Sequence, residues 1–214
     1  MCGTCNREID QSLYRRLCRA QEFLSKKVSI SDESLEKIQR IGGVDASYRG
    51  EVATVGFSVF DLSKKNIVLL SVSRMFVKMP YIPTFLSFRE GPVVLKTLRK
   101  FFDEYDALIV NGHGLAHPRK CGLATYLGVI LKKPTIGIAK KPLGGFEAEH
   151  NVNNLRMFQD RFYYSVGNMI TLEGACSLLR RITPEGFNLP IPLEVAHRFS
   201  VKMMEAITGD AERV

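Results

Sequence analysis

The stretch from residue 107 to 139 constrains the fold of this chain most. Two short apolar runs, at 107–110 and 134–139, flank a longer segment, 118–131, whose pattern favours a helix. A strand, a helix and a second strand in this order predict a parallel crossover unit, which is right-handed by default. In open α/β sheets, ligands gather beyond the carboxyl ends of the strands. We therefore expect Asn111 and Lys140, which follow the two runs, at one functional edge.

Hydrophobic periodicity predicts further elements on both sides of this unit. Apolar residues recur at helical spacing from 9 to 24, which indicates an amphipathic first helix. The β-rich stretches 52–62 and 67–77 are separated by a polar tetrapeptide and predict an antiparallel pair. Helical patterns follow at 92–105, 172–181 and 192–207. The order of elements predicts an α/β chain.

Composition predicts one domain and a partner with negative charge. The 214 residues contain no repeat or low-complexity tract, so we expect a single domain over 1–214. The net charge of +8 suits a polyanion such as nucleic acid, and simple solubility is the alternative explanation. Five basic side chains surround the first helical pattern and are either phosphate contacts or a solvated face: Arg15, Arg16, Arg19, Lys26 and Lys27.

Apolar runs and cysteines predict the compartment. No run approaches the roughly 20 apolar residues of a membrane span, and no signal peptide opens the chain, so we expect no membrane partner. The five cysteines are odd in number and scattered, which is typical of reduced thiols in a cytoplasmic protein. The spacing of Cys2 and Cys5 resembles half of a zinc site, but no second pair matches it.

Three oxygen-bearing side chains occur at expected element ends. Asp45 follows an apolar strand pattern, Glu90 precedes a predicted helix, and Asn111 ends a predicted strand. Hard cations prefer such oxygen ligands, and a metal that activates water assists phosphodiester hydrolysis. By spacing alone the signal is weak, because an isolated acidic residue at an element end is more often a cap or a surface residue.

Several short motifs recur in a fixed order between about residues 40 and 200. They are GVDASY at 43–48, PYIP at 80–83, FREGP at 88–92, GHGLAHPRK at 112–120, PTIGIAK at 134–140 and AH at 196–197. In order and spacing these motifs resemble the endonuclease V family. Several motifs in one order are far more specific to a family than any one of them. The resemblance therefore makes a functional role of Asp45, Glu90 and Asn111 more plausible than their spacing alone does.

The resemblance implies a fold and an activity. The expected fold is RNase H-like, a mixed central sheet flanked by helices with the metal centre at the sheet edge. The expected activity is that of a DNA-repair endonuclease, which recognises deaminated purines such as inosine and hydrolyses a phosphodiester on the 3′ side. Its partner would be inosine-containing DNA, with RNA as an open alternative, and we expect a monomer.

The resemblance also implies a catalytic set. Asp45 and Glu90 would bind Mg²⁺, with Mn²⁺ as a possible substitute, and the position of Asn111 would supply the third metal ligand. Lys140 would steady the phosphate or orient the attacking water, and His197 corresponds to a family histidine near the metal. An amide at Asn111 removes one negative charge where the family has a carboxylate. A natural variant, a deliberately inactivated form and a lesion-binding homologue are the open explanations.

The motif at 80–83 predicts a wedge. Pro80 and Pro83 stiffen a loop that exposes Tyr81 and Ile82, and such a wedge helps to extrude a base from a stack. In the family this loop has that role, and Tyr81 is our candidate for the wedge. An ordinary turn with a half-buried tyrosine is the alternative.

The glycine-rich motif predicts a base pocket. Glycines let backbone amides approach a flipped base, so hypoxanthine would be read by backbone hydrogen bonds at Gly112, Gly114 and Gly122. Tight turns recruit glycine for structural reasons as well. The candidates for phosphate contacts are Arg89, His113, His117, Arg119 and Lys120.

Two further hypotheses follow. The first is a binding protein that selects inosine through the same pocket and wedge but cleaves poorly or never. The second is an RNase H-like scaffold for other proteins, in which the wedge and the glycine motif would have no purpose. The segment 147–167 favours no single element, and the region between Lys140 and Leu172 departs from the family, so no site residue is expected there.

Overall fold

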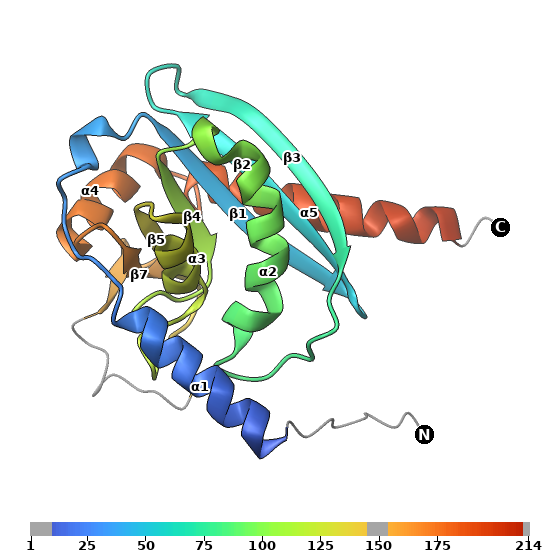
Figure 1. Ribbon diagram of the computed structural model, residues 1–214. Helices are drawn as coiled ribbons and strands as arrows, with labels where there is room; N and C mark the ends of the chain where they lie inside the picture. Colours follow the sequence, from blue (N-terminus) through green and yellow to red (C-terminus); the bar gives the residue numbers. More distant parts are fainter. Residues whose placement is uncertain (1–9, 145–153, 212–214) are drawn as a thin grey trace.

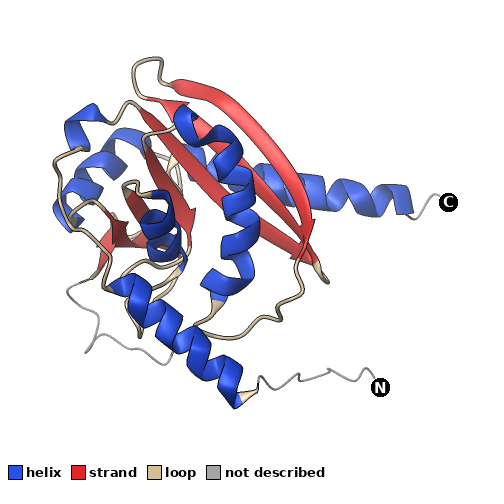
Figure 2. Ribbon diagram, in the orientation of Figure 1, coloured by secondary structure: helices blue, strands red, loops and turns tan. Residues whose placement is uncertain are grey.

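The computed structural model describes residues 10–144 and 154–211, and its centre is one seven-stranded sheet (Figure 2). Only the contacts of β1 with β4 and of β4 with β5 are parallel. Across the sheet the strands are β3 (Asn66–Phe76), β2 (Val52–Asp61), β1 (Arg40–Arg49), β4 (Ala107–Asn111), β5 (Thr135–Ala139), β7 (Phe162–Asn168) and β6 (Leu155–Phe158). The expected mixed sheet is confirmed.

Helices cover both faces of this sheet (Figure 1). On one face lie α1 (Gln11–Ser25), α2 (Leu86–Leu98) and α3 (Leu123–Leu131), and on the other lie α4 (Leu172–Ile182) and α5 (Ile191–Ala211). Short 3-10 turns occur at Leu35–Lys37 and Arg99–Glu104. Each face has its own apolar core, so β2, which lies between helices, is buried along nearly its whole length.

The crossover unit and the antiparallel pair are both as predicted. Strand β4 pairs in parallel with β5, and α3 connects them, while β2 and β3 pair antiparallel. Helix α3, however, begins at Leu123 and not at residue 118. The chain before it turns back on itself, because the Gly122 amide donates to the Gly114 carbonyl at 3.0 Å and Lys120 takes a left-handed backbone conformation with φ of 50°.

The start of α2 is also earlier than predicted, which moves Glu90. The helix begins at Leu86, so Glu90 lies inside it rather than before it, and Pro92 follows within the same helix. Pro92 is the seventh residue of the helix and lacks an N–H, so the hydrogen bond that residue 92 would make to the Phe88 carbonyl is missing. The predicted single helix over 92–105 is wrong at its end as well, because Phe101 leaves helical geometry.

The segment that favoured no single element contains two strands. Strands β6 and β7 form an antiparallel hairpin, and β7 pairs with β5 to extend the sheet. The remainder of this segment, up to residue 153, lies outside the described residues. Within 10–144 and 154–211, no helix is both long enough and apolar enough to cross a bilayer.

Candidate functional site

Strand β1 extends beyond its neighbour β4, and this difference in length opens the sheet. The parallel pairing ends where Val44 of β1 meets Val110 of β4, whereas β1 continues to Arg49. Asp45 is the first residue of β1 past this pairing. It therefore lies within a strand, not after one as expected, and side chains from both helical layers meet it at the opening.

The Asp45 carboxylate joins three segments that are far apart in the sequence. It is 6% exposed, and its Oδ1 accepts a hydrogen bond from Asn111 Nδ2 at 2.7 Å. Its Oδ2 accepts one from His197 Nδ1 on α5 at 2.6 Å. A carboxylate only accepts, so His197 carries its proton on Nδ1 and keeps Nε2 for another partner.

Glu90 approaches this carboxylate from the α2 side of the sheet. Burial, and next the negative charge of Asp45, raise the pKa of Glu90 to about 8, although the Arg89 guanidinium opposes the shift. The hydroxyl of Tyr48 is also buried and meets no hydrogen-bond partner among the described residues. Burial and the Glu90 charge raise the pKa of Tyr48 as well. The centre therefore holds two acidic groups with too little positive charge between them.

This donor set suits a divalent cation. Oxygen atoms of Asp45, Glu90 and Asn111 are the ligands that hard cations prefer, and a cation between the carboxylates would remove their repulsion. Across residues 10–144 and 154–211, no three His, Cys, Asp or Glu side chains form a ready metal site, and the Asn111 amide oxygen would be a third protein ligand beside Asp45 and Glu90. At present the amide nitrogen faces Asp45, and a half-turn of the amide would present the oxygen.

His197 and Lys140 line an open cavity beside this centre. The cavity measures about 540 Å³, and Lys140, which follows β5, is exposed at its edge. Its other lining residues are Asp160, Arg161, Asn188, Leu189 and Glu194. Sequence reasoning missed all five, since none lies in a motif; two lie inside the segment 147–167, which favours no single element, and three follow it.

Tyr81 stands at the rim of a second, smaller cavity. Its side chain is 66% exposed, and the cavity of about 50 Å³ beneath it is lined by Thr84, His113, Gly122 and Leu143 among others. Pro80 and Pro83 are also exposed, and Ile82 is half-buried. His113 follows Asn111 by two residues, so their Cα atoms lie within about 7 Å, and the cavity adjoins the acidic centre.

Two expected phosphate contacts instead hold the loop that carries Tyr81. His117 is 5% exposed, and its Nε2 donates to the Thr84 carbonyl at 2.9 Å. The Arg119 guanidinium donates to Gln21 Oε1 at 2.5 Å and stacks on the Phe85 ring at 4.6 Å. These contacts correct the prediction, because a buried imidazole and an engaged guanidinium are not offered to a phosphate.

Comparison with known proteins agrees with this geometry. The family model of endonuclease V matches residues 22–157. The chain belongs to the endonuclease V family. A curated relative, endonuclease V of Pyrococcus abyssi, is 39% identical over 189 residues, which cover 88% of this chain and 91% of the relative.

Solved endonuclease V structures share the fold, which is RNase H-like. The catalytic domain of human endonuclease V has a TM-score of 0.82 and 24% identity, with 94% of this chain and 99% of that chain covered. Endonuclease V of Ciona intestinalis, solved with a DNA that contains an inosine followed by a ribo-adenosine, has a TM-score of 0.79 and 23% identity. That comparison covers 93% of this chain and 100% of the other.

In this endonuclease V chain the glycine motif shapes the backbone. The amides of Gly112, Gly114 and Gly122 donate to Ile138 O, Ser165 Oγ and Gly114 O, at 2.8, 2.8 and 3.0 Å. A Cβ on Gly114 would lie 2.0 Å from the Val166 carbonyl oxygen. The expectation that these amides read hypoxanthine is therefore corrected, because all three are bonded within the fold.

The other candidates for phosphate contact differ in how exposed they are. Lys120 is exposed, whereas His113 is half-buried and burial lowers its pKa. Arg89 donates to the Met79 carbonyl and lies 4.5 Å above the Tyr48 ring, so it holds the start of the Tyr81 loop. Of these three side chains, only Lys120 is openly presented to solvent.

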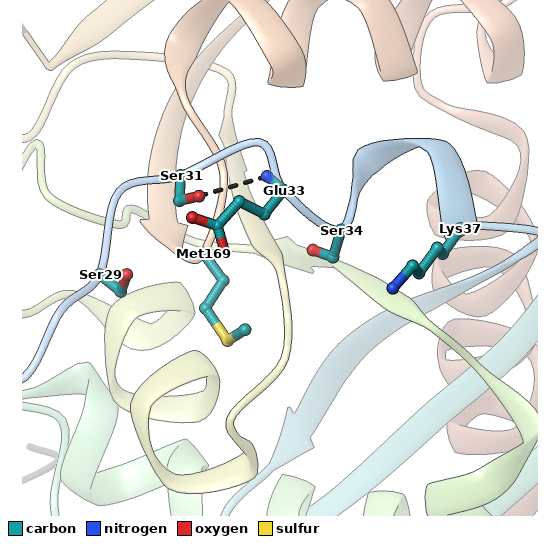
Figure 3. Close-up of a pocket in the computed structure, with 6 residues that line it drawn as sticks. All are labelled: Ser29, Ser31, Glu33, Ser34, Lys37 and Met169. Carbon is teal, nitrogen blue, oxygen red and sulfur yellow. Dashed lines mark hydrogen bonds between the residues drawn. The ribbon is translucent and has the colours of Figure 1, made fainter.

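A shallow hollow lies at the opposite edge of the sheet (Figure 3). It measures about 220 Å³ and is lined by Ser29, Ser31, Glu33, Ser34, Lys37 and Met169. Met169 follows the residue of β7 that pairs with Thr135, the first residue of β5. The hollow therefore lies at the amino ends of the parallel strands, away from Asp45, and has no part in the catalytic centre.

Proposed function

We propose that this chain is a metal-dependent endonuclease that binds inosine-containing DNA and hydrolyses a phosphodiester on the 3′ side of the lesion. The observation that carries the proposal is the placement of the acidic centre at Asp45 directly beside the cavity under Tyr81. A nuclease that acts next to a lesion needs these two parts within about one nucleotide of each other. The inosine in the DNA bound by the Ciona protein supports this choice of substrate.

Mg²⁺ is the proposed cofactor, with Mn²⁺ as a substitute, held by Asp45, Glu90 and Asn111. When bound, the metal supplies an activated water and neutralises charge on the departing oxygen. His197, oriented through its Nδ1 by Asp45, presents Nε2 to take up or deliver a proton. The Lys140 ammonium steadies the phosphate at the edge of the cavity that both residues line.

Tyr81 is the proposed wedge. An exposed aromatic ring on a loop stiffened by two prolines can enter a base stack and help to extrude the damaged nucleotide. The adjoining cavity of about 50 Å³ has room for roughly one or two waters, so it has to widen before a base enters. Leu143 lines the cavity, and displacement of its side chain would widen it.

A lesion-binding protein with little cleavage is the second candidate, and Asn111 favours it. Its amide hydrogen occupies the Asp45 oxygen that would otherwise be free for a cation. A neutral amide also brings one negative charge fewer to the centre than a carboxylate. In this version the wedge and cavity still select inosine, but the metal is held weakly.

One assay separates the two candidates. Inosine-containing and matched control oligonucleotides, as DNA and as RNA, are incubated with Mg²⁺ or Mn²⁺ and the protein or Asn111→Asp. We expect both forms to nick only the inosine strands, with Asn111→Asp at least tenfold faster at limiting Mg²⁺. Nicking by Asn111→Asp alone would favour the binding protein, and absence of selective binding by either form would contradict both.

We further propose that the protein acts as a monomer in the cytoplasm. The cytoplasmic part of this proposal is supported by Cys18, Cys121 and Cys176, which are free thiols, as in a reducing compartment. Light scattering during gel filtration tests the oligomeric state. A dimer that persists at nanomolar concentration would contradict the first part of this proposal.

A further inference from the structure

The outward face of α1 carries a basic stripe, which we define as Arg15, Arg16 and Arg19. At 100° per residue, these three side chains lie on the side of the helix opposite Gln21, whose side chain is fully buried. All three are exposed. Lys26 and Lys27 continue the same side past the end of the helix, where cations are favoured by the helix dipole.

The basic stripe has no counter-charge within the described part of the chain. There, no carboxylate lies within 4.0 Å of the three guanidinium groups. Arg15 and Arg19 are four residues apart, a spacing at which like charges destabilise a helix. The three guanidinium groups are therefore open to a partner outside this chain.

Helix α1 is joined rigidly to the loop that carries Tyr81. Gln21 Nε2 donates to the Thr84 carbonyl at 2.9 Å, and the Tyr14 ring packs edge-on against Phe85 at 5.3 Å. The helix and the loop lie side by side at one end of the molecule (Figure 1). A helix is about 10–12 Å across, so the stripe lies roughly one helix width from the loop.

A duplex carries one charge for about every 1.7 Å of its axis, so one helix width corresponds to only a few base pairs. We propose that the basic stripe of α1 binds the sugar-phosphate backbone of the substrate that flanks the lesion on the side of the Tyr81 loop. The inference rests on the proposed function for its substrate. The family model begins at residue 22, so the three arginines precede the region that defines the family.

The stripe favours nucleic acid over an acidic protein or a membrane. Its position about one helix width from the Tyr81 loop puts positive charge within reach of a strand bound at that loop. Guanidinium groups also bind phosphate oxygens in a bidentate manner. Leu13, Tyr14 and Phe23 of α1 are exposed, but at 100° per residue they point in different directions around the helix and form no broad apolar surface for a bilayer.

The test compares two triple variants of equal charge. One removes the stripe (Arg15→Ala, Arg16→Ala, Arg19→Ala), and the control removes three exposed lysines near the opposite sheet edge (Lys64→Ala, Lys96→Ala, Lys100→Ala). Binding to inosine-containing and inosine-free duplexes is measured from 50 to 200 mM salt. We expect the stripe variant to bind both at least tenfold more weakly at 50 mM salt, and the control less than threefold.

The salt dependence gives the sharper readout. Each lost phosphate contact lowers the slope of log K against log salt by about 0.9, so we expect a decrease of about two to three for the stripe variant. In nicking assays KM should rise while kcat is retained, and each single Arg→Ala variant should lower the slope by about one or less. Removing the flanking base pairs on the side of the Tyr81 loop, while keeping those on the other side of inosine, should abolish the difference.

Two results would overturn the inference. Equal losses in the two triple variants would mean that only overall charge acts, and an unchanged salt slope would mean that the stripe does not touch phosphates. Failure of the proposed function is separable from both. In that case the parent protein shows no preference for inosine, while the inosine-free duplex, which needs no lesion pocket, still reports on the stripe.

Discussion

The acidic centre and the corner that holds the Tyr81 loop differ in how their polar groups are paired. At the centre, Asp45 and Glu90 are buried together with little compensating charge, and the Tyr48 hydroxyl has no partner among the described residues. In the corner, Gln21 and Arg119 bond one another and the surrounding backbone. Unbalanced charge therefore identifies the part of the molecule that awaits a ligand, and complete pairing identifies the part that supports it.

The largest effect is expected when Glu90 of the acidic centre is replaced, because activity and stability should then respond differently. Glu90→Gln keeps the shape but removes a metal oxygen, so we expect nicking to fall by about a thousandfold. Stability without metal at pH 7 should not fall, because burial and Asp45 already disfavour the charged form. Thermal melting with and without Mn²⁺ checks both expectations, because Mn²⁺ should raise the melting temperature of the parent protein but not that of Glu90→Gln. Glu51→Gln, at an exposed glutamate, serves as the control.

Removing the Gln21 hydrogen bonds beside the Tyr81 loop should lower the stability of the fold rather than the rate of nicking. Gln21→Ala takes a hydrogen-bond partner from each of the Thr84 carbonyl, the Cys121 carbonyl and the Arg119 guanidinium, which we expect to cost about 3 kcal/mol in the free energy of unfolding. Urea denaturation measures the loss, with the exposed Gln11→Ala on the same helix as the control. A loss below about 0.5 kcal/mol would contradict the comparison, because the hydrogen bonds of Gln21 would then not stabilise the fold.

The pH dependence of stability tests the same corner through His117. Burial lowers the pKa of His117 to about 4 from an ordinary value near 6.5. The unfolded chain takes up this proton below about pH 6.5 and the folded chain only near 4, so stability falls as pH drops between these values. His117→Gln should reduce that fall by about 2 kcal/mol in denaturation curves at pH 7 and pH 4. Parallel curves for the two proteins would contradict a buried, neutral imidazole.

The smallest effect is expected at Tyr81. Tyr81→Ala removes an exposed ring, so stability should stay within about 0.5 kcal/mol, while affinity for an inosine duplex should fall about fivefold. Phe76→Ala, at another exposed ring outside the loop, should leave affinity unchanged. Equal behaviour of the two variants in binding assays would remove the wedge from the proposal.

The sequence predicted the elements better than it predicted the roles of the polar residues. Periodicity identified the crossover unit and the antiparallel pair, because a buried strand and an amphipathic helix each leave a local pattern. It did not find the hairpin of β6 and β7, whose pairing with β5 is a long-range contact. It also placed the starts of α2 and α3 incorrectly, since Pro92 and Pro118 were taken as start signals.

The candidate site divides in the same way. The order of the motifs predicted that Asp45, Glu90 and Asn111 would lie at one edge of the sheet. It could not show that β1 continues past the end of β4 at this edge. His117 and Arg119 were assigned to phosphates because polar residues in a glycine-rich motif suggest binding. Only the fold brings Gln21, from a separate helix, to the Arg119 guanidinium, and the Thr84 carbonyl to the His117 imidazole. Arg161 and Asn188 carried no motif at all.

The hydrogen bond from His197 to Asp45 also has a consequence for biosynthesis. Asp45 emerges early from the ribosome, whereas the histidine belongs to the last helix, which packs along β1 and β2. The nascent chain thus lacks a complete centre until α5 has been translated. A nuclease whose centre is completed in this order is inactive during its synthesis, and fragments that end before His197 lack activity.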